Sequence, residues 1–312
     1  MALKLGVHTG QQDVELDELR SLWRYIDGHG WDFISIWDHF YEAPPRDGTS
    51  PAFEAIAAMS VLAAETAQVR IGCHVFCMNY RNPALLAKSL LTIDHASHGR
   101  VEVGLGAGWH VQEHEAYGYT FPSVKERLDR LEEGIQIIRG MFTQDRTTFA
   151  GQYYRVTDAT LYPRPVQQRV PIVVGGRGEK RTLKLAAQYA DGWNVPYINL
   201  EEYQRLNGVL DQWCERLDRD PTELERSVNL HMHMGANQAD ADRIKSERAA
   251  TIRGGGALTG TPQEAIETLK YYEQAGAARV SIAIRPPIEW DALHAFAEEV
   301  IPAIKQSPPR PA

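Results

Sequence analysis

Cysteine and long apolar runs are both scarce in this sequence. The three cysteines, Cys73, Cys77 and Cys214, are too few for a disulfide framework, which indicates a reducing compartment. No apolar run approaches the roughly 20 residues needed to cross a bilayer. The segment Met1 to Leu5 lacks the apolar core of a signal peptide. We therefore expect a cytoplasmic protein with no membrane span.

Positive charge is also in deficit. Lysine and arginine number 33 against 41 aspartate and glutamate residues, which gives a formal net charge of -8. This balance disfavours general attraction to nucleic-acid phosphates and to anionic membrane surfaces. Hydrophobic residues make up 43% of the chain and charged residues 24%, which is ordinary for a folded globular protein. We expect a small-molecule substrate and no nucleic-acid or membrane partner.

Short apolar runs alternate with longer amphipathic segments along the whole chain, as expected of repeated β-α units around a parallel sheet. Periodicity alone does not separate an open doubly wound sheet from a closed barrel, but eight candidate strands favour an α/β fold of the (β/α)8 TIM-barrel type. The expected strands are Leu3 to His8, Phe33 to Trp37, Val69 to Phe76, Val101 to Leu105, Pro171 to Val174, Gly192 to Val195, Val228 to Met234 and Arg279 to Ile284. The expected helices include Leu16 to Asp27, Phe53 to Thr66, Pro83 to Ala96, Val124 to Met141, Lys180 to Tyr189, Glu201 to Leu217 and Pro262 to Ala275.

Capping signals support two of these helices. Thr261, Pro262 and Glu264 fit a capping box with proline at the first helical position. Asn82 followed by Pro83 opens an earlier helix by the same logic.

Two stretches are longer than a normal connection, at about 143–170 and about 235–260. Insertions of this length at the C-terminal face of a barrel are typical of lids. The proline-rich tail, 307–312, is predicted to be disordered. We therefore expect one barrel domain over residues 1–306 with two insertions.

The first candidate site lies at Trp37 to Phe40, directly after the second expected strand. Side chains at the C-terminal ends of barrel strands point into the catalytic mouth. His39 is suited to proton transfer near neutral pH, and Asp38 can fix its tautomer or bind a cofactor hydroxyl. The alternative is that Asp38 caps a turn and His39 is a surface residue.

The second candidate, Gly72 to Arg81, is a strand that runs into a polar and aromatic loop and carries His74 and Cys77. The alternative is a buried strand whose small and sulfur-bearing side chains fill the barrel. Cys73 and Cys77 lie four residues apart without a second pair, which argues against zinc.

The third candidate is the glycine-rich turn Val174 to Thr182, between an apolar strand and a helix. Glycine lets backbone N–H groups approach a phosphate, the helix N-terminus adds a positive dipole, and Arg177 adds charge. The alternative is a flexible loop with solvated charges.

Two motifs resemble other kinds of site. Gly104 to Trp109 resembles a dinucleotide fingerprint, but Trp109 stands at the third glycine position, and we reject a Rossmann site. His110 to His114 fits the H-x-x-E-H pattern of a metalloprotease group, but it follows a glycine-rich strand end instead of lying inside a long helix. We expect no metal site.

With these residues in hand, the chain resembles the luciferase-like flavin and deazaflavin oxidoreductases, and within them the branch that depends on coenzyme F420. The resemblance extends from about Leu3 to Ile304. It is most specific at Tyr80 to Lys88, Gly104 to Trp109, Glu113 to Gly118 and Tyr189 to Asn194.

The resemblance implies a ring-binding barrel mouth. It places His39 at the reactive face of the ring, with Asp38 beside it. It places His74 and Val75 at a strand bulge with a non-prolyl cis peptide behind the ring, and Cys77 at the ring edge or ribityl chain. Its implied cofactor contacts further include Gly108 and the phosphate loop of Gly175, Gly176, Arg177 and Gly178.

The implied activity is hydride transfer between C5 of the deazaflavin and a small organic substrate, with His39 as catalytic proton donor or acceptor, in a homodimer. Trp109 stands where sugar-phosphate dehydrogenases of the family carry Glu, and Gln112 where they carry Asn, so the resemblance does not extend to that substrate. One alternative is an FMN-dependent monooxygenase that uses reduced flavin and oxygen. Another is a non-catalytic flavin-binding carrier.

Overall fold

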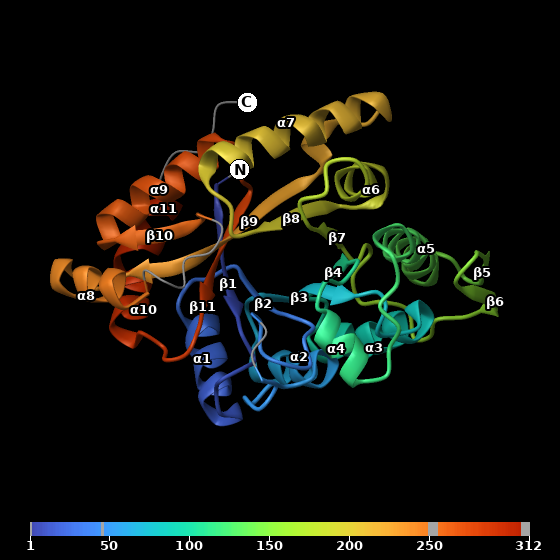
Figure 1. The fold of residues 1–312 in the computed structure, drawn as a ribbon, viewed down its shortest axis with the longest axis horizontal. Helices are drawn as coiled ribbons and strands as arrows, with labels where there is room; N and C mark the ends of the chain where they lie inside the picture. Colours follow the sequence, from blue (N-terminus) through green and yellow to red (C-terminus); the bar gives the residue numbers. More distant parts are fainter. Residues whose placement is uncertain (1, 45–46, 249–254, 307–312) are drawn as a thin grey trace.

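The chain folds into a closed barrel of parallel strands surrounded by helices (Figure 1). The computed structural model describes residues 2–44, 47–248 and 255–306. The barrel order is β1-β2-β3-β4-β7-β8-β9-β11, and pairing of β11 with β1 closes it, so the predicted fold is confirmed. The barrel strands are β1 (Lys4–Thr9), β2 (Phe33–Ile36), β3 (Arg70–Cys77), β4 (Val101–Gly106), β7 (Ile172–Gly175), β8 (Gly192–Pro196), β9 (Glu225–Met234) and β11 (Arg279–Ile284).

Amphipathic helices cover the outside of the barrel and bury their apolar sides against it. The two predicted caps are present: Asn82 accepts hydrogen bonds from the N–H groups of Ala84 and Leu85, and Thr261 forms a capping box with Glu264. The helices are α1 (Leu16–Gly28), α2 (Ala55–Glu65), α3 (Pro83–Ala96), α4 (Val111–Ala116), α5 (Val124–Thr143), α6 (Thr182–Tyr189), α7 (Leu200–Arg216), α8 (Gln238–Arg248), α9 (Pro262–Gln274), α10 (Trp290–Ala295) and α11 (Ile301–Lys305). A 3-10 turn, η1 (Pro221–Glu223), precedes β9, and a π-helical turn, η3 (Phe296–Val300), joins α10 to α11.

The two long stretches contain regular structure that the sequence patterns did not predict. The first holds an antiparallel hairpin, β5 (Thr147–Ala150) and β6 (Arg155–Ala159), which Figure 1 shows beyond α5 at the edge of the molecule. The second holds α8 and β10 (Ala257–Gly260), and β10 pairs with the C-terminal end of β9, from His231 to Met234. A lid role for either stretch stays a prediction.

Two boundary predictions differ from the structure. Helix α6 begins at Thr182 and not at Lys180, because the glycine-rich turn extends further than the charge pattern indicated. Strand β9 begins at Glu225, three residues before the expected start, because Glu225 to Ser227 pair with β8.

The tail 307–312, which was predicted to be disordered, lies outside the described residues. No helix in the described chain is both long and apolar enough to cross a membrane.

Candidate functional site at the barrel mouth

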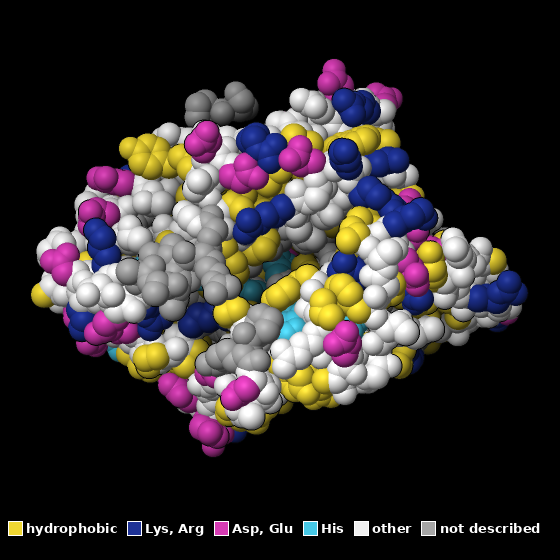
Figure 2. Space-filling view, viewed as in Figure 1, with side chains coloured by type: hydrophobic (Ala, Val, Ile, Leu, Met, Phe, Trp, Pro, Cys, Tyr) yellow, Lys and Arg dark blue, Asp and Glu magenta, His cyan; other side chains and the backbone are white. Residues whose placement is uncertain are grey.

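The predicted site residues lie at the C-terminal ends of four neighbouring strands. Asp38 and His39 follow β2, His74 to Cys77 end β3, Gly108 follows β4, and Gly175 to Gly178 follow the apolar part of β7. Because β2, β3, β4 and β7 are adjacent in the barrel, these residues gather on one half of its mouth. Figure 2 shows histidine side chains in a hollow at the centre of this face.

His39 is held by a buried carboxylate. Its Nδ1 lies 2.9 Å from Oε2 and 3.1 Å from Oε1 of Glu113, whose side chain is fully buried. Three further hydrogen-bond donors fix the carboxylate itself: Oε1 accepts hydrogen bonds from the backbone N–H groups of Phe40 and Tyr41, and Oε2 accepts one from the hydroxyl of Tyr80. Burial alone would raise the pKa of Glu113, but the hydrogen bonds from His39, Tyr41 and Tyr80 lower it below its usual value.

The protonation pattern of the pair follows from this geometry. An ionised carboxylate only accepts hydrogen bonds, so Nδ1 of His39 carries the proton that lies between them. Nε2 is then the nitrogen that accepts or gives a proton. No described residue forms a hydrogen bond with Nε2, and the half-exposed Trp109 ring packs edge-on to the imidazole at 5.3 Å. An imidazole oriented in this way can act chemically as a general base.

Asp38 does not fix the His39 tautomer, which corrects one of the two roles considered for it. Its buried carboxylate forms two hydrogen bonds with the guanidinium of Arg81, at 2.6 and 2.8 Å, and accepts the backbone N–H of Cys77 at 2.9 Å. Burial raises the pKa of Asp38, and the Arg81 charge offsets part of that effect. Asp38 therefore joins the loops after β2 and β3, whereas Glu113 orients the histidine.

Glu113 was not among the predicted site residues, although it belongs to the metalloprotease-like motif and to one of the segments that carry the family resemblance. The motif does not form a zinc site in the structure: the Nδ1–H of His114 donates to the carbonyl of His110, and Glu113 faces His39. Within the described ranges, no group of three or more His, Cys, Asp or Glu side chains is placed to hold a metal ion. The sequence feature that could have identified Glu113 is its position in the first turn of the short helix that follows the fourth strand.

The end of β3 carries the predicted bulge. The His74–Val75 peptide is cis, and the pairing register between β3 and β4 shifts between Cys73 and Phe76. The Val75 side chain enters space that glycines leave open, since a Cβ added at Gly175 would lie 2.6 Å from its Cγ1, and one at Gly106 would collide with its Cγ2. Val75 thus forms part of the floor of the mouth.

His74 anchors this bulge from inside the barrel. Its Nε2 lies 2.8 Å from Oε1 of Glu102, and Arg279 donates to both oxygens of the same carboxylate. Burial lowers the pKa of His74 although Glu102 opposes the shift, so the imidazole is neutral and donates its Nε2–H to the carboxylate. His74 therefore does not face the mouth as an acid or base.

Cys77 lies beside Gly108 beneath the loop after β4. Burial raises the pKa of the Cys77 thiol to about 12, so it is a neutral thiol near pH 7 and not a nucleophile. Gly108 has φ +75°, and a Cβ there would meet the Cys77 sulfur. The position of Gly108 therefore favours glycine on both conformational and steric grounds.

The glycine-rich turn after β7 contains one glycine with a positive φ and one arginine that is held by backbone carbonyls. Gly176 adopts φ +130°, and its N–H donates to the carbonyl of Asn194 at 3.0 Å. The guanidinium of Arg177 donates to the carbonyls of Pro196 and Tyr197, which holds it over the end of β8. Arg181, at the start of α6, makes no capping hydrogen bond with its side chain.

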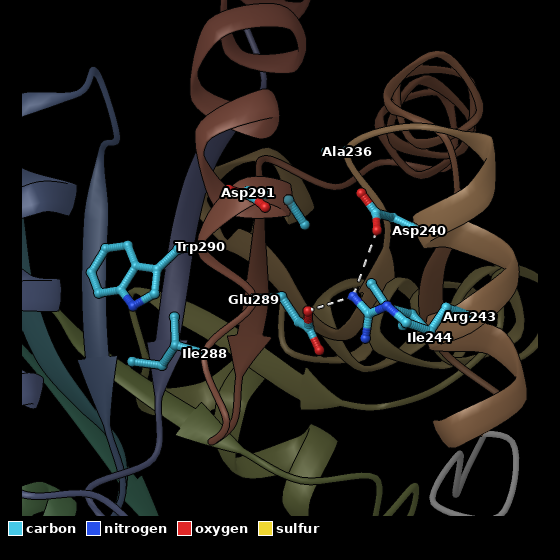
Figure 3. Close-up of a pocket in the computed structure, with 9 residues that line it drawn as sticks. Ala236, Asp240, Arg243, Ile244, Ile288, Glu289, Trp290 and Asp291 are labelled. Carbon is cyan, nitrogen blue, oxygen red and sulfur yellow. Dashed lines mark hydrogen bonds and ion pairs between the residues drawn. The ribbon is translucent and has the colours of Figure 1, made fainter.

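Two cavities lie away from the mouth. One, of about 360 Å³, opens at the N-terminal end of the barrel beside Arg279 and Glu102. The other, of about 270 Å³, lies between α8 and the start of α10, where Arg243 pairs with Glu289 and Asp240 (Figure 3). Neither contains a predicted site residue.

His233 on β9 makes stability depend on pH. Burial, followed by the charge of Arg248, lowers the pKa of His233 from 6.5 to about 4. Between these values the unfolded chain binds a proton that the folded protein does not, so stability falls as the pH drops through this window and is fully present above about 6.5. The loss from this group amounts to at most about 3 kcal/mol. We expect His233→Gln to flatten that part of the profile in urea unfolding, while a matched change at the exposed His294 leaves it steep.

Comparison with known proteins identifies a matching family and several relatives with similar names. The family described as luciferase-like monooxygenase matches residues 2–255. The chain is 35% identical over 242 residues to the F420-dependent glucose-6-phosphate dehydrogenase of Kineococcus radiotolerans, a match that covers 77% of this chain and 70% of that protein. It is 29% identical over 315 residues to the enzyme of the same name from Intrasporangium calvum, covering 88% and 91%.

Solved structures share the fold. An F420-dependent secondary alcohol dehydrogenase in complex with an F420-acetone adduct superposes with a TM-score of 0.83 at 21% identity, covering 97% of this chain and 99% of that one. A monooxygenase from Streptomyces bottropensis superposes with a TM-score of 0.80 at 20% identity, covering 96% and 99%. At these identities the likeness concerns the barrel alone.

Proposed function

Because the chain belongs to the luciferase-like monooxygenase family, we propose that it is a coenzyme F420-dependent oxidoreductase that transfers a hydride between the deazaflavin C5 and a small organic substrate. The observation that carries the proposal is the His39–Glu113 pair at the mouth, with Nδ1 of His39 2.9 Å from the carboxylate. Relatives named as F420-dependent dehydrogenases support the choice of cofactor. The sequence-based prediction of F420 as the cofactor, in preference to FMN, is consistent with the F420-dependent activity that the names of these relatives state.

His39 is the proposed catalytic residue. In alcohol oxidation its Nε2 takes the hydroxyl proton, and in carbonyl reduction it returns a proton to the oxygen. Glu113 stabilises the resulting imidazolium and keeps the reactive nitrogen directed into the mouth, because its own position is fixed by the N–H groups of Phe40 and Tyr41. The Trp109 ring lies against one side of the His39 imidazole.

The residues at the mouth fit a deazaflavin. When bound, the cofactor supplies the two-electron hydride chemistry. We propose Val75 and Cys77 as its contacts at the ring, with Asp38, His74 and Gly108 supporting that surface, and His39 at the reactive face. Gly175, Gly176, Arg177 and Gly178 are the proposed phosphate loop. Oδ1 of Asn79, in the loop after β3, is a buried acceptor with no hydrogen-bond partner among the described residues, and it suits a polar ligand.

The sugar phosphate of the dehydrogenase relatives is not part of this proposal. Trp109 occupies the position beside His39 where the resemblance places a glutamate, and Gln112 is exposed to solvent. Position 109 therefore adds no carboxylate to that of Glu113 beside His39.

We further propose a homodimer in the cytoplasm, on the basis of family membership. Sedimentation of the purified protein tests the assembly.

Turnover tests the proposed activity directly. The protein is mixed with oxidised F420 and a set of secondary alcohols, and separately with reduced F420 and a set of ketones, enones and imines, while the visible absorbance of the oxidised cofactor is followed. We expect cofactor-coupled conversion of at least one class in the absence of oxygen. Substrate conversion that needs oxygen and reduced FMN would contradict the proposal.

A change in the floor of the mouth tests the ring site. Gly175→Ala places a methyl group 2.6 Å from Cγ1 of Val75, so we expect Val75 to shift and F420 to bind more weakly. Overpacking of this kind costs about 1–3 kcal/mol of stability. The matched control is Gly208→Ala at an exposed position of α7, where a Cβ meets nothing within 4 Å and helix propensity favours alanine. Thermal melts and F420 titration of both variants measure the two effects, and unchanged F420 affinity in a folded Gly175→Ala protein would exclude Val75 from the ring site.

A further inference from the structure

The mouth has a second half that the proposed cofactor contacts do not use. Those contacts follow β2, β3, β4 and β7, whereas β8, β9 and β11 form the opposite side of the barrel. Tyr197 follows β8, His231 and His233 lie near the end of β9, and Arg285 follows β11. A substrate that approaches the ring has this half of the mouth available to it.

Arg285 is held across this half. Its guanidinium lies over the Trp37 ring with Cζ 4.2 Å from the ring centroid, and it donates to the hydroxyl of Tyr197 at 3.2 Å. A further hydrogen bond goes to the carbonyl of Ala43 at 3.0 Å. Trp37 follows β2 and Tyr197 follows β8, which lie two strands away from β11 in opposite directions around the barrel. The guanidinium therefore bridges the mouth and does not extend into solvent.

The charge of Arg285 is not matched by a carboxylate among the described residues. Its hydrogen-bond partners are a carbonyl and a phenol, which are both uncharged. Arg81, on the cofactor side, pairs instead with Asp38 and Glu54. A guanidinium has five N–H donors, and the two protein acceptors use two of them. A half-buried cation with unused donors favours an anionic ligand, and the planar fork matches a carboxylate.

We propose that Arg285 binds a carboxylate of the substrate, which makes the preferred substrates carboxylate-bearing alcohols or carbonyl compounds. This inference rests on the proposed oxidoreductase function. Trp37 lies between the two ends of such a substrate, with its ring centroid 6.4 Å from that of His39 and the Arg285 guanidinium on its face. The carboxylate is thereby held to one side of Trp37 while the reacting carbon lies near His39. Arg285 is a specificity-determining residue in this arrangement.

Matched acid and ester pairs test the proposal. Pyruvate, lactate and 4-oxopentanoate, each beside its methyl ester, are titrated by calorimetry into the protein with and without bound F420. We expect at least one acid to bind about tenfold or more tightly than its ester, as charge-assisted hydrogen bonds predict. Arg285→Met should remove this preference and leave ester binding unchanged, and Arg285→Lys should retain part of it.

The control is Arg243→Met, a change of the same chemistry in the peripheral pocket of Figure 3, which should keep the preference for the acid. Thermal melts show whether each variant is folded, and the lysine variant keeps the test valid if the methionine variant is not. Equal binding of acids and esters in both cofactor states, or a preference that survives Arg285→Met, would overturn the proposal. Failure of the protein to bind F420 contradicts the function instead, and the cofactor titration detects it separately.

Discussion

His39→Asn is expected to lower kcat for F420-coupled turnover by about 10²–10⁴-fold, the usual contribution of a positioned general acid or base. Asparagine retains a polar side chain near Glu113 but has no group that exchanges a proton near neutral pH. F420 affinity should change much less, because most of the proposed contacts lie on β3, β4 and β7. Steady-state kinetics and cofactor titration of the same preparation measure both quantities.

The matched control is His98→Asn, at an exposed turn position with φ 54°, where asparagine is well tolerated. This variant should retain wild-type turnover. A non-catalytic flavin-binding carrier would show no turnover in either protein. Full activity in a folded His39→Asn variant would remove His39 from the mechanism.

Glu113→Gln should lower kcat on the order of 10²-fold or more with little loss of stability. The N–H groups of Phe40 and Tyr41 both point at Oε1, so they hold the amide oxygen at that position. The amide nitrogen then faces Nδ1 of His39 and donates to it. This moves the imidazole proton to Nε2, where it blocks the base.

Nitrogen NMR of the imidazole distinguishes the two tautomers directly, and this readout does not depend on activity. Glu115→Gln is the matched control on the same helix, because Glu115 is exposed and lies outside the His39 network. Its tautomer and turnover should match those of the wild type. An unchanged His39 tautomer in Glu113→Gln would show that Glu113 does not orient the base.

The sequence predicted the barrel because its strands and capped helices are local features. Thr261 with Glu264 and Asn82 with Pro83 signal helix starts within four residues, and the structure contains both caps. The β5–β6 hairpin was not predicted, since its strands are four and five residues long and half-exposed, which leaves little periodicity to detect. The short helix α4 was missed for the same reason.

The site was only partly predictable. Its positions follow from the rule that side chains at strand ends face the mouth, and the resemblance added the cis peptide at Val75. The His39–Glu113 contact joins residues 74 positions apart, and the adjacent Asp38 gave a simpler local partner that the structure directs to Arg81. Arg285 likewise gains its setting from Trp37 and Tyr197, which are remote in sequence.

The most direct test of the central claim is calorimetric titration of the purified protein with F420 and, separately, with FMN. We expect micromolar or tighter binding of F420 and much weaker binding of FMN. Tight FMN binding with weak F420 binding would contradict it, and the FMN-dependent monooxygenase would then become the leading alternative.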